Sequence, residues 1–397
     1  MDVITLSAQR RNKVWLDKVS GRFETFLEEV SRETRIEDWP HAAGVEKNVL
    51  IYDGGSVRNA ARDREARLAL SAEWAEVFMS GPGVIVIKGA MTDLAVIDEA
   101  TAIFDRIIEE EKAGSGGGGD HFAKAGANDR IWNALEKHCL AEPENFAHYY
   151  ACDAIAMASE AWLGRGYQVT AQVNRVNPGG AAQTPHRDYH LGFMSPEQMN
   201  AFPAHIHQVS PLLTLQGAVA HCDMPVESGP TLLLPYSQTF FEGYLAFERE
   251  PFQRYFAENH VQLPLAKGDA VFFNPALMHG AGTNRSTDIR RMANLLQVSS
   301  AFGRAMESVD RSKMAVTLYP ALKAAQEAGR MSEAELSNAV AACAEGYAFP
   351  TNLDRDPPKG GLAPKSQADL MLEALLAGVE PTSFAEQMAA YDERRLT

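Results

Sequence analysis

The segment YQVTAQVNRVNPGGAAQTPHRD, residues 167–188, indicates both the fold and the chemistry that we expect of this chain. Its first ten residues favour a β-strand, because β-branched and other apolar residues recur there at short intervals. His186 and Asp188 follow at the end of the segment. Residues two apart in extended backbone project from the same face, so this imidazole and this carboxylate can aim at one point.

Further strand-like runs follow this segment and are separated by turns rather than by long helices. Such a series of short β-segments is typical of a sandwich or barrel of mostly antiparallel strands. With helical signals on either side, we expect a mainly β chain with flanking helices, of the α+β class, whose core is a jelly roll. The runs lie at 211–220, 231–234, 270–273 and 292–298.

The flanks of the β-rich region show helical spacing of apolar residues, and one further short apolar run, 84–87, predicts a buried strand. Ser332 and Glu335 form the pattern of a capping box that opens a helix. We expect residues 1–79 to form an N-terminal helical extension, 80–304 the core, and 305–397 a C-terminal helical extension, all packed as one compact unit. Helical signals lie at 12–36, 66–79, 92–112, 128–164, 332–345, 366–377 and 383–394.

The net charge of −15, from 52 acidic and 37 basic residues, argues against nucleic acid and anionic membranes as partners. The four cysteines are scattered without a C-x-x-C pair, which argues against a zinc knuckle or a disulfide framework. No stretch is apolar enough for a membrane span or a secretory signal. We therefore expect a cytoplasmic protein that acts on a small molecule, and the extra helices at both ends could form a homodimer contact.

His279 is the candidate for a third ligand beside His186 and Asp188. Two imidazoles and one carboxylate form the facial triad that holds non-haem Fe(II) and leaves coordination positions open. The H-x-D tripeptide alone carries a high false-positive risk. A second feature strengthens the prediction: Arg290 lies eleven residues beyond His279, at the head of a strand-like run. Its guanidinium could grip the distal carboxylate of 2-oxoglutarate with two parallel hydrogen bonds.

Several motifs follow one another in a specific order. They are Pro178-Gly179-Gly180 with Gln183, then His186-Arg187-Asp188, then Glu227-Ser228-Gly229-Pro230-Thr231, Pro235-Tyr236-Ser237-Gln238, and finally Gly268-Asp269 through His279-Gly280 to Arg290. In this order the motifs resemble those of the phytanoyl-CoA dioxygenase family of Fe(II)/2-oxoglutarate oxygenases. The resemblance covers roughly residues 80 to 300.

The resemblance implies a double-stranded β-helix core and assigns roles by position. It implies that His186, Asp188 and His279 hold iron, and that Arg290 binds 2-oxoglutarate, with dioxygen as the second co-substrate. Gln172 and Asn174 are expected to be further polar contacts to 2-oxoglutarate. Two departures matter: Ala281 stands where the family often has Ser, and Arg291 adjoins Arg290 although only one of them can face inward. The spacing favours Arg290.

The expected reaction is hydroxylation of an unactivated C–H bond in a small polar or anionic metabolite, with release of succinate and CO2. A carboxylate at Asp188 argues against halogenation, because related halogenases have a small residue there. His121, Arg187 and His190 are candidate substrate contacts. Two alternatives remain: a cupin-type metal-dependent isomerase or lyase that needs no 2-oxoglutarate, and a non-catalytic family member that acts as a binding module.

Overall fold

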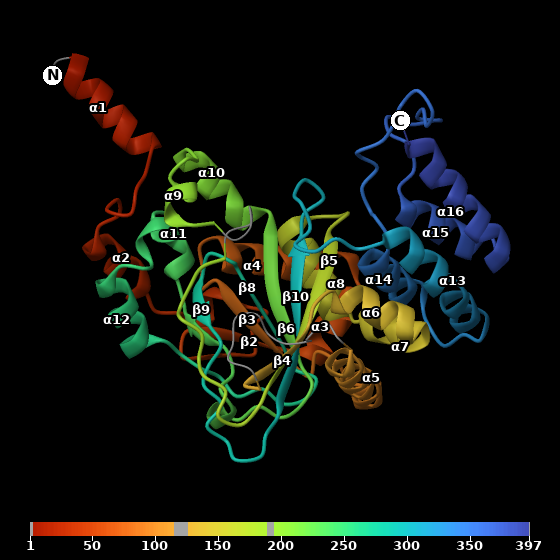
Figure 1. The fold of residues 1–397 in the computed structure, drawn as a ribbon, viewed down its shortest axis with the longest axis horizontal. Coiled ribbons are helices and arrows are strands. Elements are labelled where there is room, and N and C mark those ends of the chain that lie inside the picture. The colour runs from red at the N-terminus through yellow and green to blue at the C-terminus, as the bar shows by residue number, and fades with distance from the viewer. Residues whose placement is uncertain (1–2, 115–125, 189–193, 397) are drawn as a thin grey trace.

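The computed structural model describes residues 3–114, 126–188 and 194–396. Within them one large sheet has eight strands (Figure 1). Every neighbouring pair is antiparallel except β2 and β3, which run parallel. In spatial order the strands are β1 (Gly44–Glu46), β2 (Val49–Asp53), β3 (Val84–Lys88), β8 (Ala270–Phe273), β6 (Thr214–Ala220), β10 (Arg291–Ser299), β5 (Gln168–Val176) and β4 (Asn128–Ile131).

A smaller sheet, β7 (Leu232–Leu234) with β9 (Met278–Gly280), packs against the large one. Isolated bridges extend it at both edges, from Leu233 to Val261 and from His279 to His186. An apolar cluster joins the two sheets, with Val271 and Phe273 from the large sheet and Leu233 from the small one. Two sheets enclosing one core are the jelly roll that the sequence predicts, and the fold class is confirmed.

Helices cover the other face of the large sheet. Ile85 and Ile87 of β3 point into this helical core, whereas Val84 and Val86 point toward the small sheet. Both faces of β3 are therefore buried, which explains why its sequence is apolar throughout instead of alternating. The helices of this layer are α3 (Gly54–Ala61), α4 (Arg64–Met79), α5 (Leu94–Ala113), α6 (Ala134–Ala141), α7 (Pro143–Tyr150) and α8 (Asp153–Leu163).

The remaining helices gather at two sides of the sheets (Figure 1). On one side lie α1 (Val3–Val14), which projects from the body, α2 (Phe23–Val30), α9 (Pro196–Met199), α10 (Ala204–Val209), α11 (Gly243–Ala246) and α12 (Glu250–Asn259). On the other side lie α13 (Arg311–Glu327), α14 (Glu333–Cys343), α15 (Gln367–Leu376) and α16 (Pro381–Arg395). The predicted capping box at the start of α14 is present, with Ser332 and Glu335 bonded reciprocally.

Three expectations about the flanks are wrong in part. Residues 128–131 form β4 rather than helix, because they pair with β5 and all four are buried. The segment 1–79 is not wholly helical, since β1 and β2 join the large sheet. A single helix over 12–36 does not form, because α1 ends at Val14 and α2 begins at Phe23. Between them Gly21 has φ +85°, a backbone conformation that residues other than glycine rarely adopt.

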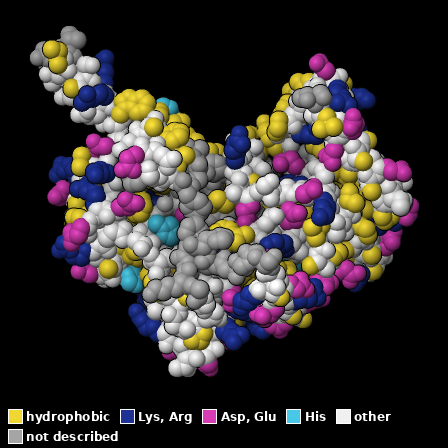
Figure 2. Space-filling view, viewed as in Figure 1, with side chains coloured by type: hydrophobic (Ala, Val, Ile, Leu, Met, Phe, Trp, Pro, Cys, Tyr) yellow, Lys and Arg dark blue, Asp and Glu magenta, His cyan; other side chains and the backbone are white. Residues whose placement is uncertain are grey.

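The surface carries charges of both signs. On the face drawn in Figure 2, acidic and basic side chains are interspersed, and a notch in the outline separates the side of α10 from the C-terminal helices. No helix among the described residues is both long enough and apolar enough to cross a bilayer.

Candidate metal centre and its cavity

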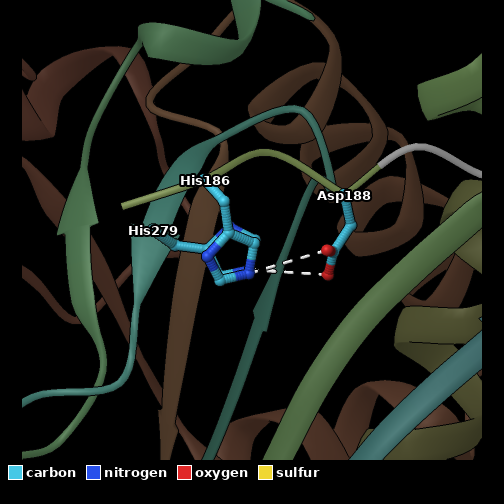
Figure 3. Close-up of side chains that lie close together, drawn as sticks. All are labelled: His186, Asp188 and His279. Carbon is cyan, nitrogen blue, oxygen red and sulfur yellow. Dashed lines mark ion pairs between the residues drawn. The ribbon is translucent and has the colours of Figure 1, made fainter. Parts of the chain in front are cut away.

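His186, Asp188 and His279 converge on one point, as the sequence predicts (Figure 3). One candidate ligand atom from each lies within 4.8 Å of the other two. The Nε2 atom of His186 is 3.6 Å from Asp188 Oδ1, and that of His279 is 3.6 Å from Asp188 Oδ2. The bridge between His186 and His279 creates this proximity, because the two backbones exchange hydrogen bonds of 2.9 and 3.0 Å.

Both imidazoles are oriented in the same way by the carbonyl two residues earlier. His186 Nδ1 donates to the carbonyl of Thr184 at 2.9 Å, and His279 Nδ1 donates to that of Leu277 at 2.7 Å. A carbonyl oxygen only accepts, so each Nδ1 carries the proton and each Nε2 presents a lone pair. Two lone pairs therefore face the carboxylate of Asp188 with no proton between them, an arrangement that suits a metal cation.

The ionisation states of His186 and Asp188 also suit a metal. Burial lowers the pKa of His186, and the neighbouring His279 ring lowers it further, so the neutral ligand form is favoured. Burial alone would raise the pKa of Asp188, but positive charge on the His279 and His186 rings and the amide of Gln216 outweigh it and hold that pKa below its usual value; when both rings are neutral, a bound cation would supply that positive charge. Gln216 donates its Nε2–H to Asp188 Oδ2. The carboxylate is thus ionised and fixed in orientation.

Arg187, between the two ligands, directs its guanidinium to backbone carbonyls, although the residue also borders the cavity. Its guanidinium donates to the carbonyls of Ala276, of Phe240 at 2.9 Å and of Ser237 at 2.8 Å, and it lies 5.1 Å from the centre of the Tyr244 ring. Burial lowers its pKa to about 10. These hydrogen bonds anchor the segment that carries the ligands, so they favour an anchoring role for Arg187 over the substrate contact predicted from the sequence.

A cavity of about 950 Å³ opens beside the three side chains, between the two sheets. Alternate residues of the large sheet form its floor, because successive side chains of a strand point to opposite faces. From β10 the alternating residues Arg291, Ala293, Leu295 and Gln297 line the cavity, and Leu296 between them also borders it; the lining from β5 and β6 includes Gln172, Asn174, Gln216 and Ala218.

The placement of Arg290 is a correction to the sequence analysis. Arg290 precedes β10 and is exposed, outside the cavity lining, whereas Arg291 is 7% exposed and lines the cavity. The prediction that Arg290 faces inward is wrong, because Arg291 pairs with Val176 and shares the cavity face of β10 with Ala293. Burial lowers the pKa of Arg291 to about 10, and its Nη1 has no hydrogen-bond partner among the described residues.

The other predicted residues are partly accounted for. Gln172 and Asn174 both line the cavity. Gln172 accepts a hydrogen bond of 3.2 Å from Nη1 of Arg130, a cavity residue that the site prediction did not include. Whether Gln172 and Asn174 contact 2-oxoglutarate stays a prediction. His121 and His190 lie outside the described residues.

Comparison with known proteins agrees with this geometry. The sequence profile of the family described as Phytanoyl-CoA dioxygenase (PhyH) matches residues 70–292, more than half of the chain. The chain belongs to the phytanoyl-CoA dioxygenase family. No curated protein matches this family member.

Solved structures that resemble this phytanoyl-CoA dioxygenase family member share little sequence with it. The epimerase SnoN from nogalamycin biosynthesis is 20% identical, with 60% of this chain and 85% of that chain covered and a TM-score of 0.42. The carbocyclase SnoK is 18% identical, with 75% and 97% covered and a TM-score of 0.44. HygX from Streptomyces hygroscopicus is 13% identical, with 62% and 91% covered and a TM-score of 0.41. Similarity at this level does not identify a substrate.

The cofactors of the phytanoyl-CoA dioxygenase family are iron, 2-oxoglutarate and dioxygen, and the residues present fit them. Two imidazole lone pairs and an ionised carboxylate are a donor set for Fe(II). A buried guanidinium with an unpartnered Nη1 in the same cavity fits a dicarboxylate co-substrate. The chain is therefore an enzyme of the iron- and 2-oxoglutarate-dependent superfamily.

Proposed function

We propose that this enzyme hydroxylates an unactivated C–H bond of a small polar or anionic metabolite. In the balanced reaction, one atom of dioxygen enters the substrate as a hydroxyl group and the other enters succinate, while 2-oxoglutarate loses CO2. The observation that carries the proposal is the combination in one cavity of the His186, Asp188 and His279 donor set with the unpartnered guanidinium of Arg291.

Each of these side chains has a role in the proposal. His186, Asp188 and His279 would hold the iron, which together with 2-oxoglutarate supplies the oxidising chemistry when bound. Arg291 grips the distal carboxylate of 2-oxoglutarate, because a guanidinium offers two parallel N–H donors to a carboxylate. This assignment replaces Arg290, which is exposed.

The surroundings of the donor set hold it in place. Gln216 fixes the Asp188 carboxylate, and the carbonyls of Thr184 and Leu277 keep both imidazoles in the Nδ1–H form. Phe273 packs on the ring of His279, with 4.8 Å between the ring centres. Such fixed surroundings support catalysis because ligands that need no rearrangement keep the reacting groups aligned.

A cupin-type isomerase or lyase would use the same three ligands without 2-oxoglutarate. That alternative gives no reason for a buried arginine with an unpartnered nitrogen in the cavity, so Arg291 favours the oxygenase. A non-catalytic binding module is disfavoured because the donor set is complete.

A screen of metabolites tests the proposal. Purified enzyme is incubated with Fe(II), dioxygen and 2-oxoglutarate labelled at the carboxylate that leaves, and CO2 and succinate are measured for each compound. We expect at least one compound to stimulate release of both, with a product heavier by one oxygen atom, and no stimulation in Asp188→Ala. Conversion of a compound without succinate formation would contradict the proposal and favour the lyase.

A further inference from the structure

The cavity wall contains amide oxygens that no group in the described chain satisfies. Gln216 Oε1, Gln297 Oε1 and Asn174 Oδ1 are buried and have no hydrogen-bond partner. All three side chains line the cavity, and those of Gln216 and Asn174 are 4% and 6% exposed. Leaving a buried acceptor unpaired costs roughly 1–3 kcal/mol, so a bound molecule that supplies donors here gains affinity.

Gln216 and Gln297 form a pair next to the metal centre. They lie directly opposite one another on β6 and β10 and both line the cavity. The orientation of Gln216 is fixed by chemistry: its Nε2–H donates to the Asp188 carboxylate, which only accepts, so its oxygen remains an acceptor. The amide of Gln297 offers one acceptor and two donors. The pair can therefore receive a group that both donates and accepts.

The three arginines of the cavity lining have other partners or roles. Arg187 donates to three backbone carbonyls. Arg130 donates to Gln172, lies 5.0 Å from the centre of the Trp132 ring, and is close enough to Glu307 to stabilise its carboxylate. Arg291 is assigned to 2-oxoglutarate. A carboxylate or phosphate has acceptors only, so beside Gln216 Oε1 and Asp188 it would meet like partial charges.

We propose that Gln216 and Gln297 together bind a hydroxyl group of the substrate, which donates to Gln216 Oε1 and accepts from Gln297 Nε2. The substrate class is then a hydroxyl-bearing compound such as a sugar or cyclic polyol, with the oxidised carbon close to that hydroxyl. This inference rests on the proposed function, because it places the substrate in the cavity that holds the metal. It narrows the proposed substrate class, because the group that binds at Gln216 and Gln297 is polar and uncharged rather than anionic.

Equilibrium binding without turnover tests the inference. The enzyme is loaded with Mn(II) and 2-oxoglutarate in the absence of oxygen, and calorimetry measures its affinity for methyl glucoside, myo-inositol and cyclohexane-1,2-diol. Each probe is paired with analogues in which a single hydroxyl is replaced by hydrogen. We expect one hydroxyl to raise affinity about tenfold in the unmodified enzyme, the value of one well-placed hydrogen-bonding group.

The matched variants are Gln297→Met, which removes the amide at similar size, and Leu295→Met, which alters an apolar residue on the same face of β10. The gain from the hydroxyl should vanish in Gln297→Met and persist in Leu295→Met. The readout is the ratio of the affinities of a probe and its deoxy analogue for one protein. A substitution that weakens the binding of both compounds equally therefore leaves the ratio unchanged. A gain that survives in Gln297→Met, or no gain for any probe, overturns the inference. Failure of the unmodified enzyme to bind 2-oxoglutarate overturns the proposed function instead.

Discussion

His186 and His279 lie opposite one another across an isolated antiparallel bridge, and each ring donates its Nδ1–H to the carbonyl two residues before it. The same hydrogen bond from the ring to a backbone carbonyl is thus used twice, once on each side of the bridge. Both Nε2 atoms consequently reach the carboxylate of Asp188 at 3.6 Å. The bridge is the structural reason that two histidines far apart in sequence can serve one metal ion.

Arg291 rather than Arg290 should control the use of 2-oxoglutarate. Replacing the buried Arg291 with Leu removes the guanidinium from the cavity, so the KM for 2-oxoglutarate should rise by about 10- to 100-fold, the value of a charge-assisted bidentate pair. Arg290→Leu is the matched control because Arg290 is exposed, and its KM should stay within about twofold of the unmodified enzyme. Steady-state kinetics that show the larger effect in Arg290→Leu would contradict the assignment.

Gln216 should act as a positioning residue for Asp188. Gln216→Met keeps the side-chain size but removes the N–H that donates to the carboxylate, so Fe(II) affinity should fall about tenfold, as expected for loss of a hydrogen bond to a metal ligand. Gln387→Met, at an exposed position on α16, should leave it unchanged. The measurement is anaerobic Fe(II) titration, and equal affinities in the two variants would show that Gln216 does not support the ligand.

Gly243 should be required for the anchoring of Arg187. A Cβ at Gly243 would overlap Arg187 Nη1, so Gly243→Ala must displace a guanidinium that satisfies the carbonyls of Phe240 and Ser237. We expect the free energy of unfolding to fall by about 2–4 kcal/mol, together with weaker Fe(II) binding. The control is Gly44→Ala, where a Cβ meets no atom within 4 Å. Equal urea midpoints for both variants would contradict the packing argument.

His221 should make the enzyme sensitive to acid. Its Nδ1 and Nε2 are 2.8 Å from the hydroxyls of Thr101 and Tyr149, and burial, followed by the charge of His138, lowers its pKa to about 3. In the unfolded chain His221 binds a proton near pH 6.5. The contribution of neutral His221 to the free energy of unfolding is therefore complete above that pH and is lost as the pH falls toward 3.

The test compares urea unfolding at pH 7 and pH 5. The free energy of unfolding of the unmodified enzyme should fall by about 2 kcal/mol between these conditions because of His221. In His221→Gln, which should be less stable at pH 7, the fall between pH 7 and pH 5 should be smaller by that amount. An identical pH dependence in the two proteins would show that His221 is not held neutral by the fold.

Local features of the fold could be predicted from the sequence, whereas pairing between distant segments could not. The strand at 270–273 and the capping box of Ser332 and Glu335 follow from nearby residues, and the structure contains both. The parallel pairing of β2 with β3 and the pairing of β4 with β5 depend on segments that only the folded chain brings together. That is why residues 128–131 were expected to be helical.

The metal ligands could be predicted because H-x-D places two ligands on one face and His279 stands in a recognisable sequence context. The choice between Arg290 and Arg291 needed the phase of β10. Met292 and Val298 point into the helical core, so Arg290, an even number of residues away, belongs to that face and Arg291 to the opposite, cavity face. Leu295 on the cavity face is also apolar, and it obscures this alternation in the sequence. Gln216 had no local signal, because its contact with Asp188 joins β6 to a segment outside it.

Anaerobic Fe(II) titration of the unmodified enzyme and of Asp188→Ala tests the central claim most directly. The account predicts one ferrous ion per chain in the unmodified enzyme and affinity at least about 100-fold lower in Asp188→Ala, since a carboxylate ligand is lost, with the fold intact by circular dichroism. Asp288→Ala, at an exposed position, should bind as the unmodified enzyme does. Unchanged Fe(II) affinity in Asp188→Ala would contradict the metal centre described for His186, Asp188 and His279.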